Sequence, residues 1–478
     1  MYKQFIILAA AISITLMPDY LSGQTVSLND YLLHLESTHP LIKKEHIRNS
    51  IEREERLGLV GDFDWELSSS ILFAREEPEF AVLGPKRSNM LLLEAGLVRT
   101  LWSSGGQLSA GVSTARASLD IDPGLGFPDS YYQNELSVGY LHPLLKNKGG
   151  ILSRLRHDLK EYDIDFSYVE AAENIEAFLL DAGSRFLDWS FLTEQREIVR
   201  NRLALSEEEL ARVQKKRKAN LVDRADVIRA EDAVRTWEQQ LVLVESDWKA
   251  LQSELTVMAQ DSGLLVAGPS CDLYEIHEQP DLLTAMQKLE TEARPISLLT
   301  IRLQQLNHQH LALDNSARPN LSLLAKVNAH TAEEEIGQSF GIDKFDATIG
   351  LLLSYPLGNR AARSRIISNE LASDQLALER EEFVLNLKSA YASVHIKMVE
   401  MEKVLTLNQE HIESARLRTA EELRLYNQGR GELTFVIQSR DNEQDAQLTY
   451  ARNGLFYQKL LLQMKSLLDE LYPGYGDQ

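Results

Sequence analysis

The chain has 478 residues, of which 44% are hydrophobic and 25% charged, so it can form a sizeable core and is not wholly disordered. Its formal net charge of −21 argues against a nucleic-acid-binding protein, because affinity for phosphate backbones comes mainly from Lys and Arg. The single cysteine, Cys271, excludes an internal disulfide and a cysteine-rich zinc site.

The N-terminus has the features of an export signal. Lys3 supplies a positive charge, residues 5–17 form an apolar run, and small residues precede Gln24. We therefore expect residues 1–23 to be a signal peptide. A transmembrane anchor is the alternative, but the run is shorter than the roughly 20 residues that a spanning helix needs.

Six segments alternate apolar with small or polar residues, as β-strands with two different faces do. They are residues 65–75, 90–102, 107–118, a segment that ends at His142, 320–330 and 346–355. This alternation fits a barrel whose strands face lipid on one side and water on the other. It fits a sheet packed on a soluble core equally well. The export signal, the aromatic residues near strand ends and the long helices favour the barrel.

The number of strands depends on residues 101–107, where two serines and two glycines predict a tight turn. If the segments on both sides of this turn belong to the wall, one chain supplies six strands, and otherwise it supplies four. Either number is too small to enclose a wide aqueous pore, so we expect the chain to oligomerise.

Two very long helices are predicted over residues 146–218 and 360–427, which contain no proline. About 70 residues at ~1.5 Å each make a rod of roughly 100 Å. Shorter helices are expected over 224–259 and 433–471. In the second rod, apolar residues recur at coiled-coil-like spacings of three and four. They are Phe383, Leu387, Ala390, Val394, Met398, Met401 and Leu405.

Matching landmarks indicate two internal repeats. Pro40 and Pro295 precede the first strand of each half by nearly the same distance, and Pro143 and Pro356 each precede a long helix. Asparagine and glycine tolerate the left-handed backbone conformation at the C-terminal cap of a helix. Such residues occur between each rod and its return helix. The sequence therefore predicts two units of strands followed by a helical hairpin with a tip.

Three short segments stand at fixed places in this doubled organisation. Residues 317–321 (Ala-Arg-Pro-Asn-Leu) enter a strand, 355–360 (Tyr-Pro-Leu-Gly-Asn-Arg) join strand to rod, and 425–433 (Leu-Tyr-Asn-Gln-Gly-Arg-Gly-Glu-Leu) form the second tip. With these segments the mature chain resembles the TolC-like outer-membrane efflux proteins. The resemblance implies an α+β membrane protein that is a homotrimer. Its protomers would jointly form a transmembrane β-barrel in outer-membrane lipid, continuous with an α-helical barrel in the periplasm.

The resemblance also implies a function. The chain is expected to be the outer-membrane channel of a tripartite efflux or type I secretion system, docked to a periplasmic adaptor protein and driven by an inner-membrane transporter. The alternative is a secreted or periplasmic coiled-coil scaffold whose strands form a soluble cap. Family members commonly have twelve strands per trimer, two from each repeat of each protomer.

The expected domain boundaries follow from these elements. They are a signal peptide (1–23), N-terminal periplasmic helices (24–64), outer-membrane strands (65–142) and a helical hairpin (143–261) of the first repeat, an equatorial segment with helices (262–318), and strands (319–356) and a hairpin with the C-terminal segment (357–478) of the second repeat.

The hairpin tips are the predicted functional positions. For adaptor contact we expect Asn220, Leu221, Val222, Gly429, Gly431 and Leu433, although simple helix capping explains the same residues. The resemblance places a pore constriction nearby, where many members carry aspartates six and nine residues after the second tip glycine. This chain has Phe435 and Gln438 there, which argues against an acidic ring from the second hairpin and leaves an apolar ring of Phe435 as an alternative, while Asp223 and Asp226 remain acidic at the first tip.

No motif predicts an enzyme. His308 and His310 have a separation that a metal site could use, but they lie in a Gln-rich amphipathic stretch without a nearby acid cluster. No phosphate-binding loop, dinucleotide-binding turn, nucleophile elbow or His-Glu-x-x-His pattern occurs in the sequence. We therefore expect no catalytic group, cofactor or metal.

Overall fold

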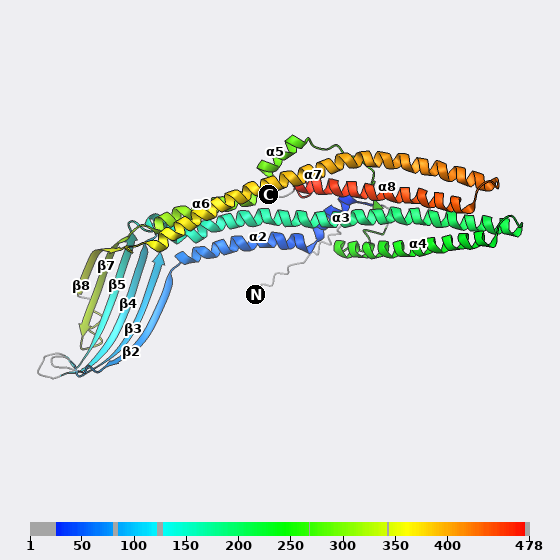
Figure 1. Cartoon of the computed structure of the whole chain (residues 1–478). Helices are drawn as coiled ribbons and strands as arrows, with labels where there is room; N and C mark the ends of the chain where they lie inside the picture. Colours follow the sequence, from blue (N-terminus) through cyan, green and yellow to red (C-terminus); the bar gives the residue numbers. More distant parts are fainter. Residues whose placement is uncertain (1–24, 80–84, 122–127, 267, 342–343, 474–478) are drawn as a thin grey trace, which may run out of the picture. The chain divides into compact units, whose positions relative to one another are not determined.

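Figure 1 shows a computed structural model of the chain, which describes residues 25–79, 85–121, 128–266, 268–341 and 344–473. The predicted signal peptide lies outside these residues. The chain divides into two compact units. We call residues 44–174 and 286–389 the sheet unit, and residues 1–43, 175–285 and 390–478 the hairpin unit.

The sheet unit contains one antiparallel sheet of six strands, which lie side by side in the order β2-β3-β4-β5-β7-β8 (Figure 1). The strands are β2 (Glu66–Glu76), β3 (Arg87–Thr100), β4 (Gln107–Asp120), β5 (Ser130–Pro143), β7 (Asn320–Glu333) and β8 (Lys344–Ser354). The hairpin β3–β4 is therefore part of the same sheet. This decides between the two strand numbers in favour of six per chain.

The turn between β3 and β4 is fixed by close backbone contacts. The backbone N–H of Leu101 donates to the Gly106 oxygen at 2.7 Å, and that of Gly105 donates to the Leu101 oxygen at 2.8 Å. Gly105 has φ +68°, and a Cβ there would lie 2.7 Å from the Cα of Gly150. Trp102 then packs against His157 of α3, with ring centroids 4.8 Å apart.

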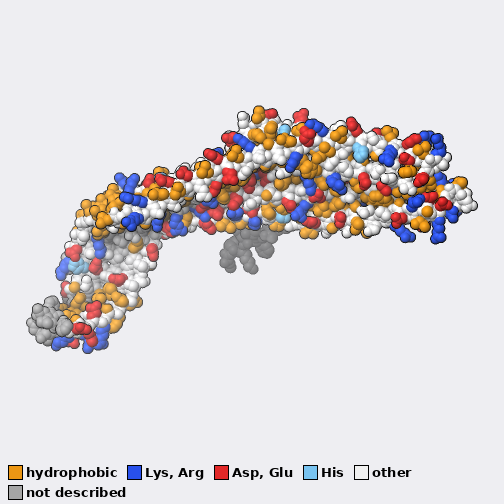
Figure 2. Space-filling view, viewed as in Figure 1, with side chains coloured by type: hydrophobic (Ala, Val, Ile, Leu, Met, Phe, Trp, Pro, Cys, Tyr) orange, Lys and Arg blue, Asp and Glu red, His pale blue; other side chains and the backbone are white. Residues whose placement is uncertain are grey.

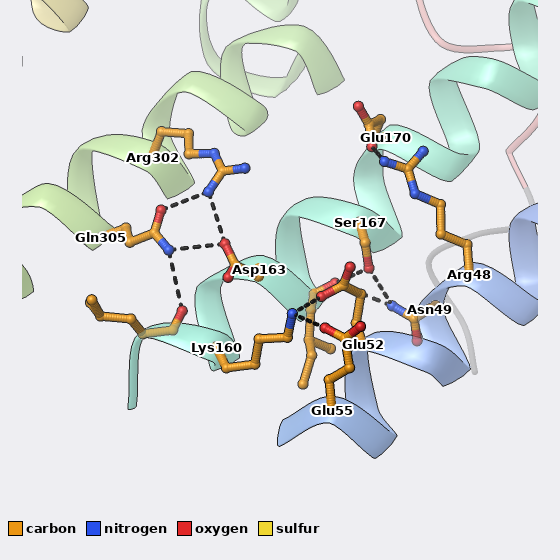
Figure 3. Close-up of polar contacts among 12 residues, drawn as sticks. Arg48, Asn49, Glu52, Glu55, Lys160, Asp163, Ser167, Glu170, Arg302 and Gln305 are labelled. Carbon is orange, nitrogen blue, oxygen red and sulfur yellow. Dashed lines mark hydrogen bonds and ion pairs between the residues drawn. The ribbon is translucent and has the colours of Figure 1, made fainter. Parts of the chain in front are cut away.

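Polar side chains join three helices of the sheet unit, as Figure 3 shows. Lys160 of α3 (Ile151–Lys218) forms ion pairs of 2.5 Å with Glu52 and with Glu55 of α2 (Pro40–Gly58). Asp163 of α3 accepts from Arg302 and from Gln305 of α6 (Arg294–Ser316), each at 2.9 Å. Burial would lower the pKa of Lys160, but the two carboxylates outweigh burial and raise it.

The first long helix begins later than predicted, at Ile151 instead of residue 146. Asn147 has a left-handed backbone with φ 63°, and its carboxamide oxygen accepts from the backbone of Leu152 and Ser153. Gly149 and Gly150 also have positive φ, within the short 3₁₀ segment η3 (Lys148–Gly150). These residues turn the chain from β5 into α3, so the helix cannot extend further back.

The hairpin unit contains two long helical hairpins and a small parallel sheet. One hairpin joins α3 to α4 (Arg224–Ala259), and the other joins α7 (Arg360–Asn427) to α8 (Leu433–Leu467). The remaining elements are β1 (Val26–Ser27), paired with β6 (Pro269–Ser270), and α1 (Leu28–Thr38). Its largest fully buried side chains include Tyr31, Phe186, Trp189, Tyr391 and Tyr457. The predicted α7 and α4 bounds are confirmed, while α8 ends four residues before residue 471.

The predicted seam of α7 is buried only in the hairpin unit. Val394, Met398 and Leu405 are buried there, whereas Phe383 and Ala390 are exposed. Tyr391 is fully buried and replaces its neighbour Ala390 in the packed face. The other helices are η1 (Leu59–Phe63) and α5 (Leu282–Glu292). In the part of the chain that the structure describes, no helix has an apolar stretch long enough to cross a membrane.

Candidate functional site

The strand register of the six-stranded sheet separates two faces of opposite character. One cross-strand row consists of apolar residues in every strand: Leu67, Leu97, Ala110, Val138, Val327 and Ala347. A row on the other face is polar throughout: Ser70, Glu94, Ser113, Glu135, His330 and Lys344. In these two rows the alternation of the sequence continues across the whole sheet, and we call the two surfaces the apolar face and the polar face.

The apolar face is exposed in the single chain. Leu67 is 71% exposed, Ile349 81% and Val327 51%. A soluble sheet covers such a face with helices or a second sheet, because exposed apolar surface is unfavourable in water. Side chains so exposed on a continuous face therefore need an apolar environment outside the chain.

The polar face carries small and charged residues. The Ser70 hydroxyl donates to the Glu94 carboxylate at 3.3 Å, and the Lys326 ammonium lies 3.9 Å from the Glu135 carboxylate. An open hollow over this face is lined by residues that include Ser68, Glu94, Gly111, Ser137 and Lys326. Such a surface is compatible with water.

The first hairpin tip is short and partly apolar. Asn220 has φ 55° and closes the end of α3, as its left-handed tolerance predicted. Leu221 is 73% exposed, whereas Val222 is half-buried. Asp223 stands at the N-cap position of α4, and Asp226 in the first turn pairs with Arg229 at 2.8 Å.

The second tip differs in what it exposes. Gly429 has φ +72°, and a Cβ at Gly431 would lie 3.1 Å from the backbone nitrogen of Tyr426. Phe435 is 48% exposed and Gln438 is also exposed. Leu433, by contrast, is only 3% exposed. The side chain of Leu433 packs inside the chain, and its contact with an adaptor stays a prediction.

Leu433 belongs to a core that joins the two hairpins near their tips. Its other buried members are Val213, Ala230, Tyr426 and Val436. Lys216 of α3 lies over the Tyr426 ring, 3.5 Å from its centroid, and donates to the Tyr426 backbone oxygen at 3.2 Å. That oxygen is in the last turn of α7, where helix carbonyls lack intrahelical partners. Burial lowers the pKa of the Lys216 ammonium, and nearby Arg212 lowers it further.

Buried charges form a second link between the hairpins. Arg202 of α3 is 3% exposed and donates to the Asp441 carboxylate of α8 at 2.7 and 3.1 Å. Glu209 of α3 pairs with Arg440 of α8 at 2.6 Å and lies 3.8 Å from Arg202. Burial raises the pKa of the Glu209 carboxyl even though both arginines lower it. By contrast, many Lys, Arg, Asp and Glu side chains lie on the face of the molecule that Figure 2 shows.

This charged link was not predicted from the sequence. Arg202, Glu209 and Arg440 occur in helices with many exposed charges, and nothing in their spacing distinguishes them. Only the contact between two hairpins that lie far apart in the sequence makes them buried.

The two histidines with metal-compatible spacing have separate partners. His308 lies 3.4 Å from the Tyr162 hydroxyl, while His310 lies 3.6 Å from the carboxylate of Asp314, one turn later in α6. The first contact joins α6 to α3 and is partly buried, and the second lies within α6.

Solved structures similar to the chain are outer-membrane channels. The outer-membrane protein VceC of Vibrio cholerae is 12% identical with a TM-score of 0.69, over 92% of this chain and 96% of VceC. The CmeC outer-membrane channel of Campylobacter jejuni is 10% identical with a TM-score of 0.67, over 94% of this chain and 87% of CmeC. The open state of the Neisseria gonorrhoeae MtrE outer-membrane channel is 12% identical with a TM-score of 0.66, over 94% of this chain and 91% of MtrE.

The chain has the fold of TolC-type outer-membrane channels. The resemblance seen in the sequence is thus confirmed at the level of the fold, over more than nine-tenths of this chain. No family model matches the sequence, and no curated protein matches it. The similar structures are only 9 to 14% identical to this chain in sequence, so most side chains differ between them. The roles of individual residues must therefore be argued from this chain's own geometry.

Proposed function

We propose that the chain is the outer-membrane channel of a tripartite efflux or type I secretion system. The observation that carries the proposal is the two-faced sheet, with exposed side chains on its apolar face and a polar row across the other face, in a chain that has a channel fold. Lipid is the environment that makes the first face favourable, and a water-filled lumen suits the second. Such a conduit needs no catalytic group, because the partner transporter supplies the energy.

Closure requires more than one copy. In the described part of the chain, the sheet ends in two edges, β2 and β8, that pair with no further strand, and six strands are too few for a wide aqueous pore. A homotrimer forms one transmembrane β-barrel from the three sheets and one α-helical barrel from the hairpins. In this arrangement the strands lie in the outer membrane and the helices extend into the periplasm, with the predicted domain boundaries.

The tips contact a periplasmic adaptor, which links the channel to an inner-membrane transporter. Asn220, Leu221, Val222, Gly429 and Gly431 are the proposed contact positions, and the exposure of Asn220, Leu221 and Gly429 supports them. Leu433 packs beneath them. Residues Asp223, Asp226, Phe435 and Gln438 form the constriction. An adaptor that binds the open tips more tightly than the closed tips shifts the population towards opening.

Planar-bilayer recording tests this proposal. The protein without residues 1–23 is purified in detergent, its mass is measured in the same detergent, and its single-channel conductance is recorded. We expect a trimer with discrete conductance steps. A monomer that stays soluble without detergent and conducts no current would contradict the channel and favour the coiled-coil scaffold.

A further inference from the structure

The two edge strands of the sheet match each other in length, direction and exposure. β2 and β8 each contain 11 residues, and they run in opposite directions. Nearly every residue of both strands is exposed, including Leu67 at 71%, Leu351 at 66% and Leu353 at 70%. Long exposed apolar edges pair with other strands, since their backbone N–H and C=O groups lack partners. The matching edges make a second copy of this chain the natural occupant.

Charge and face restrict the register of such a pairing. The apolar face of one copy must continue into the apolar face of the next copy. A slip of one residue would turn the side chains to the opposite face, so the allowed registers differ from one another by multiples of two residues. When Glu66 stands opposite Ser354, both strands pair over their full length and Glu76 stands opposite Lys344. A shift of two residues in one direction places Glu76 opposite Asp346, and like charges in opposed positions are destabilising. A shift in the other direction removes Glu76 from Lys344 and shortens the pairing.

The stagger of the sheet is compatible with this register. Following one cross-strand row from Glu66 through the six strands ends at Thr348, six residues before Ser354. In the full-length register Thr348 meets Leu72 of the next copy, six residues beyond Glu66. The stagger is therefore one residue per strand, or ~3.3 Å along the chain for each ~4.8 Å of strand spacing. This corresponds to a strand tilt of about 35°, which is within the usual range for closed barrels.

We propose that β8 of one copy pairs antiparallel with β2 of the next in this register, so that three copies close a wall of eighteen strands. The inference rests on the proposed trimer for the number of copies, while the edge pairing itself does not depend on it. The wall has half as many strands again as the twelve that the resemblance implied, because β3 and β4 belong to the sheet. Eighteen strands at this tilt give a backbone diameter of roughly 30–35 Å, wide enough for an aqueous lumen.

The extra hairpin is built into the protein and is not a loose insertion. β3 pairs with β2 over 11 residues and with β4 over 14. Its turn is held against α3, where Arg154 donates to the Trp102 backbone oxygen at 2.6 Å. Removing it would break the sheet between β2 and β5.

Disulfide trapping tests the register. In a Cys271→Ser background, which removes the native thiol, Ser69→Cys is combined with Leu351→Cys and Ser70→Cys with Gly350→Cys. Consecutive pairs alternate between two backbone geometries, so one of these pairs has the closer Cβ atoms whichever geometry applies. β2 and β8 lie at opposite edges of one chain's sheet, hence any disulfide between them joins two copies. The shifted controls combine Ser69→Cys with Ile349→Cys or with Leu353→Cys.

Covalent dimers and trimers on a non-reducing denaturing gel are expected for at least one in-register pair, about tenfold above either shifted control. Stronger trapping in a shifted control overturns the register, and no trapping at all in a preparation of trimeric mass overturns the edge pairing. Single-channel recording of the same preparations keeps the two proposals apart. Trapped trimers without conductance contradict the channel alone, whereas conducting trimers that trap at no pair contradict the edge pairing alone.

A second variant pair does not depend on cysteines. Glu76→Lys and Lys344→Glu are each expected to lower the trimer fraction in low salt several-fold, and their combination is expected to restore it. If the double variant is as weak as either single variant, Glu76 and Lys344 do not face each other and the register is wrong.

Discussion

At the residue scale, Arg202 is the side chain whose removal has the largest expected effect near the tips. Its guanidinium is 3% exposed, donates twice to Asp441 and once to Ser206, and lies over the Trp237 ring. Arg202→Met leaves the buried Glu209 carboxylate with one fewer positive neighbour. Removing one partner of a buried ion pair costs about 3–5 kcal/mol. We expect a loss of this size in the unfolding free energy at pH 7, measured by chemical denaturation in detergent.

The variant also has an expected pH signature. The folded pKa of Glu209 is already raised by burial above its ordinary value of 4.5, and losing Arg202 raises it further. A carboxyl with a raised folded pKa destabilises the fold at high pH, and this cost is relieved as pH falls through the folded pKa towards 4.5. The deficit should therefore shrink as pH falls from 7 to 5. Arg212→Met removes a 37% exposed arginine from the same helix, and its cost should stay below ~1 kcal/mol at both pH values.

At the element scale, neighbouring residues of β8 test the assignment of the two faces. Ile349 lies on the apolar face and is 81% exposed. Thr348 lies on the polar face, directly opposite Lys326 of β7. A lysine on a lipid-facing strand costs about 2–4 kcal/mol at the bilayer midplane, whereas one in the lumen costs little. Ile349→Lys should therefore reduce insertion into lipid vesicles strongly, and Thr348→Lys should insert like the unmodified protein. Equal losses for both variants would mean that β8 does not separate lipid from water.

The elements themselves were largely predictable, because their signals are local. Proline-free stretches with helical periodicity predicted α4 and α7 at their observed bounds, and alternation predicted the strands. The start of α3 was missed because Asn147 adopts a left-handed backbone, which depends on its contacts with Gly105 and Ser153. The strand number was open for a similar reason. A serine-glycine turn at 103–106 does not reveal whether its strands join the sheet, and only the pairing of β3 with β2 and of β4 with β5 does so.

The tip residues were harder to predict, since burial there depends on distant parts of the chain. Glycine and asparagine positions could be recognised from their conformational tolerance, and Asn220 and Gly429 have the positive φ expected of them. Leu433 was one of the six tip positions for which an adaptor contact was predicted from the sequence. It is buried because α3 supplies Val213 and α4 supplies Ala230 to the same core. Such contacts between repeats leave no mark in local spacing.

At the scale of the whole molecule, the proposed trimer places three copies of each tip around one axis. If Phe435 and Gln438 line the constriction, the second hairpins contribute an uncharged ring there, and ions pass without strong discrimination by this ring. Phe435→Asp combined with Gln438→Asp would introduce six carboxylates, and rings of carboxylates select for cations. We expect the reversal potential in a salt gradient to shift towards that of the cation.

The matched control, Phe435→Asn with Gln438→Asn, makes nearly the same change in size without the charge, so it should widen the pore and leave selectivity unchanged. A shift of equal size in both double variants would mean that side-chain volume, and not charge, sets selectivity. No shift in either would place the constriction elsewhere, with Asp223 and Asp226 of the first hairpin as the next residues to neutralise.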